Sequence, residues 1–128
     1  KGLAILAFGS MVEPCERIGA ELDATIVNMR FVKPIDEMLI VDMCRDHELI
    51  ITVEENVIAG GAGAAVNEVI VANGIKQKVA NYGLPDRLLQ HGSREDMLRD
   101  AGLDYEGILN FITEQNDGSA KQKKVSSA

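Results

Sequence analysis

Two adjacent carboxylates and a glycine-rich loop are the part of this sequence whose residue types could carry chemistry. Glu54 and Glu55 end an apolar run, and the loop that follows contains Gly60, Gly61 and Gly63. Paired carboxylates are the acids of glycosidases, which place them on either side of one bond. Adjacent residues on a strand point to opposite faces, so these two side chains cannot flank one substrate together. At most one of them faces a site, and the alternative for both is a salt bridge or a helix cap.

The glycine loop stands between an expected strand and an expected helix. Glycines there allow positive φ and a close approach of the helix start, whose free N–H groups can hold an anion. The alternative is that they only pack a structural turn. The order Gly61-x-Gly63-x-x-Val66 approximates a dinucleotide fingerprint, but its third small residue is missing and no acidic residue closes the strand near Tyr82. A P-loop is excluded because no Gly-Lys-Ser/Thr sequence follows.

The other reactive residue types lack the spacing of a catalytic or metal site. The histidines His47 and His91 have no partner at a metal-ligand spacing, and neither Ser10 nor Ser93 lies in a Gly-x-Ser-x-Gly motif. Three basic residues stand next to expected strand ends or turns, where we interpret them as members of surface or inter-domain ion pairs: Arg30, Lys33 and Arg87.

These residues are carried by apolar runs of strand length that alternate with helical stripes, the pattern of an α/β domain. Short connections and right-handed crossovers predict that the first three strands are parallel. The fourth has a weaker apolar pattern and could be parallel or antiparallel. The expected strands are Leu3–Phe8, Thr25–Arg30, Leu49–Val53 and Gln77–Tyr82, and the expected helices are Val12–Leu22, Asp36–Asp46, Ala64–Ala72, Arg94–Ala101 and Asp104–Glu114.

The composition fits one acidic domain with an aliphatic core. The chain has 128 residues, is 46% hydrophobic and carries a formal charge of −7. That charge argues against nucleic-acid and anionic-membrane partners, and the apolar runs are too short to span a bilayer. The two cysteines, Cys15 and Cys44, form no CxxC motif and fall in helical patterns. Free buried thiols in a reducing, cytosolic compartment are therefore expected.

The two ends of the sequence differ in character. The first expected strand begins at Leu3, and no initiator Met or lead-in loop precedes it, which suggests a piece of a longer polypeptide. The last residues, 116–128, are polar and low in complexity, and we expect them to form a flexible polar tail after a domain at 1–115. Residues and patterns alone thus indicate an acidic α/β domain with no self-contained active site.

Several segments together resemble the C-terminal domain of the 1-deoxy-D-xylulose-5-phosphate synthases, and the resemblance covers nearly all of Leu3–Phe111. The Val-Glu-Glu sequence with its glycine loop also occurs in the wider transketolase and 2-oxo acid dehydrogenase β-chain families, but the full set is more specific. The segments are Asn28–Asp36, Thr52–Asn56, Gly60–Glu68, Gly83–Arg87 and His91-Gly92.

The resemblance implies a fold and a parent enzyme. The fold would be a three-layer αβα sandwich whose five-stranded sheet is mostly parallel, with one edge strand in either direction. The parent would be a cytoplasmic homodimer that uses thiamine diphosphate and Mg²⁺ to condense pyruvate with glyceraldehyde 3-phosphate. Its diphosphate-binding motif, Gly-Asp-Gly followed by Asn, is missing from this sequence. The chain alone is therefore expected to bind no cofactor and to be inactive.

The role implied for this domain is packing against the other domains of the parent chain and dimerisation. No residue carries over as catalytic, cofactor-binding or metal-binding. The candidates for an interface or an anion site are Arg30, Glu54, Glu55, Gly60, Gly61 and Gly63. The alternatives are the matching domain of a 2-oxo acid dehydrogenase β-chain or a transketolase, and an independent anion-binding α/β domain.

Overall fold

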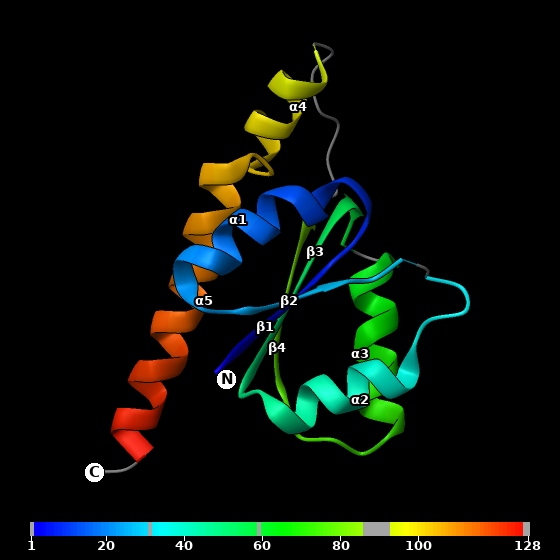
Figure 1. Ribbon diagram of the computed structural model, residues 1–128, viewed down its shortest axis with the longest axis vertical. Helices are drawn as coiled ribbons and strands as arrows, with labels where there is room; N and C mark the ends of the chain where they lie inside the picture. Colours follow the sequence, from blue (N-terminus) through cyan, green and yellow to red (C-terminus); the bar gives the residue numbers. More distant parts are fainter. Residues whose placement is uncertain (1, 31, 59, 86–92, 127–128) are drawn as a thin grey trace.

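A single parallel sheet lies between two layers of helices in this computed structural model, which describes residues 2–30, 32–58, 60–85 and 93–126 (Figure 1). The side chains are described as far as residue 118. Within these residues the sheet has four strands in the order β2-β1-β3-β4, and every neighbouring pair is parallel. The strands are β1 (Leu3–Ala7), β2 (Thr25–Asn28), β3 (Leu49–Val57) and β4 (Lys78–Leu84).

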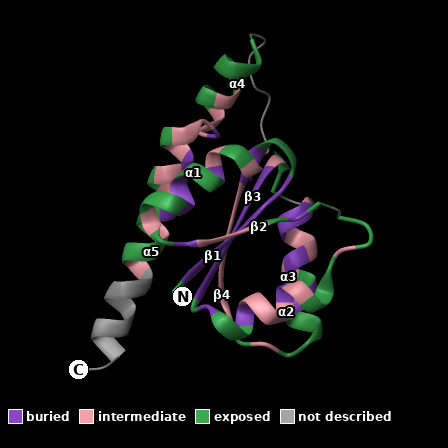
Figure 2. Cartoon of the chain, viewed as in Figure 1, coloured by how far each residue is buried: buried purple, intermediate pink, exposed green. Residues whose placement is uncertain are grey.

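The two central strands, β1 and β3, are buried on both faces, as their unbroken apolar runs require (Figure 2). Their side chains alternate between two separate cores. Leu3, Ile5 and Ala7 of β1 join one core, whereas Ala4 and Leu6 join the other. The same alternation in β3 sends odd-numbered residues to the first core and even-numbered residues to the second.

Each core is closed by its own helices, which lie on opposite sides of the sheet in Figure 1. The first core is covered by α1 (Val12–Leu22) and α5 (Tyr105–Ser126), with α4 (Arg94–Ala101) at its end; the second is covered by α2 (Glu37–Asp46) and α3 (Ala62–Ala72). A short 3-10 turn, η1 (Gly9–Met11), joins β1 to α1. Among the described residues, no helix is both long and apolar enough to cross a lipid bilayer.

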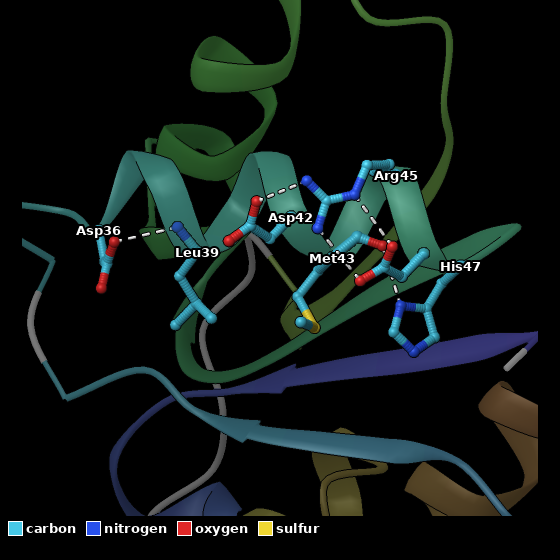
Figure 3. Close-up of polar contacts among 7 residues, drawn as sticks. Asp36, Leu39, Asp42, Met43, Arg45 and His47 are labelled. Carbon is cyan, nitrogen blue, oxygen red and sulfur yellow. Dashed lines mark hydrogen bonds and ion pairs between the residues drawn. The ribbon is translucent and has the colours of Figure 1, made fainter.

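Helix α2 shows how local sequence sets the ends of an element (Figure 3). Asp36 is the N-cap residue, and its Oδ1 accepts a hydrogen bond from the amide of Leu39 at 3.0 Å. At the other end, Arg45 pairs with Asp42 at 3.1 Å and with Asp46 at 3.1 Å. The ring Nδ1 of His47 donates to the carbonyl of Met43 at 2.9 Å, which satisfies one carbonyl of the last turn.

The five-stranded sheet implied by the resemblance is wrong for the described part of the chain, where four strands pair. After β4, the described residues form only α4 and α5, whose ends are fixed by a Ser93 cap and a left-handed Gly102. Their apolar residues recur at helical spacing, so none is left for a fifth strand. The direction left open for the fourth strand is settled, because β4 pairs with β3 in parallel.

Helix α5 is longer than predicted. It begins at Tyr105 and continues through Ser126, so residues 116–126, expected to be a flexible tail, have helical backbone. The segment is polar and begins with poor helix formers, among them Asn116 and Gly118, but residues 120–124 (AKQKK) are good helix formers, and the segment extends a helix already begun on the core. The domain boundary at residue 115 stays a prediction.

The cap of α2 gives a direct test of this account. We expect Asp36→Ala to lower the free energy of unfolding by about 1 kcal/mol, because the amide of Leu39 loses its acceptor. Asp42→Ala in the same helix removes only an exposed ion pair and should cost less than about 0.5 kcal/mol. Urea denaturation of both variants checks this, and equal losses would contradict the capping role.

Candidate functional site at the carboxyl end of strand β3

The predicted carboxylates lie where a parallel sheet of this topology places its ligands. The chain leaves β1 toward β2 and then returns past β1 to β3, so the strand order reverses between β1 and β3. In open α/β sheets, the crevice outside the carboxyl ends of two such strands is the usual binding position. Ser10 follows β1 at this edge, and Glu54 and Glu55 are in the last part of β3.

Glu54 caps the start of α3. Its side chain is turned into the protein, and the residue is only 2% exposed. One carboxylate oxygen accepts from the amide of Ala62 at 3.1 Å, and the other from the amide of Gly63 at 2.5 Å. Burial raises the pKa of Glu54, and the two backbone hydrogen bonds partly offset that shift. Two of the free amides predicted to hold an anion therefore bind the chain's own carboxylate.

An irregularity in the sheet makes this contact geometrically possible. Val53 is paired with Tyr82 and Val57 with Leu84, so three residues of β3 face the single residue Gly83 of β4. Such a bulge bends the strand and re-aims its side chains. A Cβ atom on Gly83 would lie 2.6 Å from the carbonyl oxygen of Asn56, so only glycine allows this close approach.

The loop glycines serve different purposes. Gly60 has φ of +73° and open space around it, so its need is conformational. Gly61 is needed for space, since a Cβ there would overlap Oε1 of Glu54. Gly63 is also needed for space, because a Cβ there would lie 2.6 Å from Oγ1 of Thr52. The predicted close approach of the helix start is thus made to Glu54 and Thr52.

Glu55 points to the other side of the sheet, as strand alternation requires. Its carboxylate accepts a hydrogen bond from the hydroxyl of Ser10, and Nη2 of Arg94 lies 2.5 Å from the same oxygen. The Ser10 hydrogen bond and then the Arg94 guanidinium hold the pKa of Glu55 below its usual range. The two glutamates therefore connect different elements, and the structure does not bring them together as a catalytic pair.

A half-buried amide network beside Glu54 was not singled out from the sequence. Nδ2 of Asn81 donates to Oγ1 of Thr52 at 2.7 Å, and Nδ2 of Asn67 donates to Oδ1 of Asn81 at 2.8 Å. Thr52 is fully buried. The sequence held a signal for this network, because Thr52 in β3 and Asn67 in α3 are polar residues within otherwise apolar patterns. The network connects β3, β4 and α3 directly behind the glycine loop.

Arg30 is not part of this corner. It is exposed and lines a separate hollow of about 250 Å³ at the end of β2, together with residues of the 34–39 segment. The lining of that hollow includes none of the residues of the Glu54 corner. Of the other basic candidates, Lys33 is exposed beside the same segment, and Arg87 lies outside the described residues, as does His91.

The remaining reactive side chains either join two elements or are buried in the core. His47 bridges α2 and β2, because its Nε2 lies 2.8 Å from Oγ1 of Thr25. Cys15 and Cys44 are free and buried, and burial raises the pKa of both thiols, that of Cys15 to about 12. Within the described residues, no group of three or more His, Cys, Asp or Glu side chains is placed to hold a metal ion.

The fit of Gly61 against Glu54 can be tested by mutant cycles. We expect Gly61→Ala to destabilise the chain by about 1–3 kcal/mol, because the new methyl group overlaps the carboxylate. In a Glu54→Ala background the penalty should be smaller, although the carbonyl of Val57, 2.5 Å from the same Cβ position, keeps it above zero. Urea denaturation of the single and double variants measures the coupling.

Gly60→Ala is the matched control for this cycle. It should cost about 1 kcal/mol through its positive φ, and that cost should be the same with or without Glu54. Strictly additive effects for Gly61 and Glu54 would show that the contact between these two residues carries no energy.

The burial of Glu54 also predicts a pH dependence. Because the pKa is raised in the folded state, folded protein holds this proton more tightly than unfolded protein. Its contribution to stability is therefore present below the unfolded pKa and is lost as the pH rises through the folded pKa. The difference in unfolding free energy between wild type and Glu54→Gln should fall as the pH is raised above about 4.5, the ordinary value. If this difference in unfolding free energy instead grew with pH, the hydrogen bonds from the two amides would lower the pKa of Glu54 by more than desolvation raises it.

Comparison with known proteins shows what the whole chain is similar to. It is 53% identical to the 1-deoxy-D-xylulose-5-phosphate synthase of Nitrosococcus oceani, over 88% of this chain and 18% of that protein. It is 52% identical to the enzyme of the same name from Thioalkalivibrio sulfidiphilus, over 85% of this chain and 17% of that protein. The chain thus spans less than a fifth of the length of these relatives.

The fold comparison agrees with the sequence comparison. A solved split-gene transketolase, described as an inactive β4 tetramer, superposes on 91% of this chain and 40% of its own, with a TM-score of 0.82 and 26% identity. The family model for the transketolase C-terminal domain matches residues 1–108, which include β1 to β4 and the Glu54 corner. The resemblance inferred from the sequence is confirmed, and the chain belongs to the transketolase C-terminal domain family.

Proposed function

We propose that this chain is the C-terminal domain of a 1-deoxy-D-xylulose-5-phosphate synthase. That enzyme would condense pyruvate with glyceraldehyde 3-phosphate, release CO₂ and supply a precursor of isoprenoids in the cytoplasm. The observation that carries the proposal is identity of about 50% to several synthases across 83–90% of this chain. Two proteins this similar over a whole domain share its fold.

In this proposal the domain contributes no reacting group. Thiamine diphosphate and Mg²⁺ would be held elsewhere in the polypeptide, because the sequence lacks the Gly-Asp-Gly and Asn motif of the diphosphate site. The carboxylates that could have served a metal or a proton transfer are used internally. Glu54 is bonded to Ala62 and Gly63, and Glu55 to Ser10 and Arg94.

The role proposed for the domain is assembly: it packs against the rest of the polypeptide and supports a homodimer. The Glu54 corner favours this role because it is rigidly built, with a buried cap and sterically required glycines. It also carries exposed apolar side chains, Val57 and Ile58, each 39% exposed. A transketolase parent is the second candidate, but its solved relative is only 26% identical to this chain.

The parent activity is tested on the full-length polypeptide that carries this sequence. With thiamine diphosphate and Mg²⁺, we expect it to convert pyruvate and glyceraldehyde 3-phosphate to 1-deoxy-D-xylulose 5-phosphate with release of one CO₂ per product. Product formation is followed by mass spectrometry. Two-carbon transfer between sugar phosphates, without this condensation, would instead assign the chain to a transketolase.

The assembly role predicts how a Glu54 variant behaves. In the full-length polypeptide, Glu54→Ala should raise the dimer dissociation constant by about tenfold, equivalent to about 1.4 kcal/mol. Turnover per assembled dimer at saturating cofactor should change much less, because the side chain touches no substrate. Sedimentation velocity and steady-state kinetics separate the two effects. Glu16→Ala, at an exposed position of α1, is the control; an intact dimer without turnover would refute the assembly role.

A further inference from the structure

Helix α3 has the composition of a buried helix although one side of it is exposed. Among its eleven residues, Glu68 is the only charged one. A helix that is apolar all round is normally covered on all sides. In this chain α3 packs on the sheet through Val66, Val69 and Ile70, whereas Val71 is 77% exposed. The outer surface of α3 therefore has a composition suited to a further contact.

Two neighbouring apolar side chains share this side of the sheet. Met38, near the start of α2, is 79% exposed, and Val32, in the segment before α2, is 39% exposed. The ion pairs of α2 join Arg45 to Asp42 and to Asp46, and Asp42 stands one turn after Met38 (Figure 3). Together with the segment before α2, the α2–α3 side of the sheet thus exposes three large apolar side chains.

The opposite helix layer is built differently. Its outer side chains are paired with one another: Arg17 approaches Glu13 at 4.0 Å and lies over the ring of Tyr105 at 4.4 Å, and Arg99 pairs with Asp96 at 3.3 Å. Charged side chains in such surface pairs are typical of a solvated helix face. Among the described residues of that layer's helices, only Met97, at 37%, is a large apolar residue with comparable exposure.

The surface between α2 and α3 is also hollowed. One recess of about 430 Å³ lies between the 32–35 segment and α3. Its lining is mixed, with apolar residues such as Val32 and Val69 beside the charged Lys33, Glu37 and Glu68. A second recess, of about 260 Å³, is lined by Met38, Val41, Asp42 and Asn73 and shares Glu37 with the first. We call this connected surface, together with Val71, the α2–α3 recess. Its shape suits protruding side chains of a protein partner.

We propose that the α2–α3 recess is the docking surface for a preceding domain of the same polypeptide. This rests on the proposed function, under which the 128 residues are one domain of a chain about five times longer. The matched synthases extend over more than four fifths of their length outside the region similar to this chain, and the matching family is by description a C-terminal domain. In that longer chain, the preceding domain would cover this partly apolar surface.

The test is cysteine accessibility in the full-length polypeptide. Val71→Cys and Met38→Cys replace the two most exposed large apolar residues of the described part of the chain, and Met97→Cys and Glu16→Cys are controls on the opposite helix layer. Each variant is reacted with a maleimide, and the rate at each site is read from its peptide by mass spectrometry. The native thiols Cys15 and Cys44 are buried and should react slowly.

Burial in an interface should make the Val71 and Met38 sites react at least tenfold more slowly than the Met97 site, although their side chains are the more exposed in this domain. Equal or faster labelling at both sites would overturn the proposal. Slow labelling that speeds up when the protein is diluted below its dimer dissociation constant would assign the recess to a second copy, which also overturns it. Failure of the synthase assay with slow, dilution-independent labelling would refute the proposed function and leave the docking surface intact.

Discussion

The bond between the Glu54 carboxylate and the first amides of α3 is the interaction on which the rest of this domain depends. It places a buried carboxylate on the positive end of a helix, where two donors offset part of the cost of its removal from water. The bulge opposite Gly83 allows that contact, and the absence of a side chain at Gly61 leaves room for the carboxylate. Gly63 lacks a side chain for a neighbouring reason, since a Cβ there would meet Thr52 and Asn81.

The alternation of side chains along β3 then places its polar residues on opposite sides of the sheet. Even-numbered residues of β3 face α3, so Thr52 and Glu54 join the polar corner of that layer, and Glu55 turns to Ser10 and Arg94 in the other. The two carboxylates that resemble a catalytic pair in the sequence instead form separate structural contacts, one with each helix layer. This division explains why a domain with acidic residues at the usual ligand position of an α/β sheet uses them for its own architecture.

Most of the fold could be predicted from the sequence because its signals are local. The runs Leu3–Phe8 and Leu49–Val53 and the cap at Asp36 determine strands and a helix within a few residues. The direction of β4 could not be predicted, since Gln77–Tyr82 is amphipathic and its pairing depends on β3. A helix cap was one interpretation of Glu54, but the bulge that permits it depends on the register of strands about thirty residues apart. The helix beyond Gln115 was missed because polarity was interpreted as disorder.

The pairing of β1 with β3 has a consequence for the order in which the chain can fold. Glu54 and Gly63 are nine residues apart, so β3, its loop and α3 are joined by short-range contacts. Leu3 and Leu49, by contrast, are paired although they lie 46 positions apart in the sequence (49 minus 3), and the centre of the sheet forms only when that loop has closed. Loop-closure entropy therefore favours formation of the β3–α3 unit before β1 is paired with it.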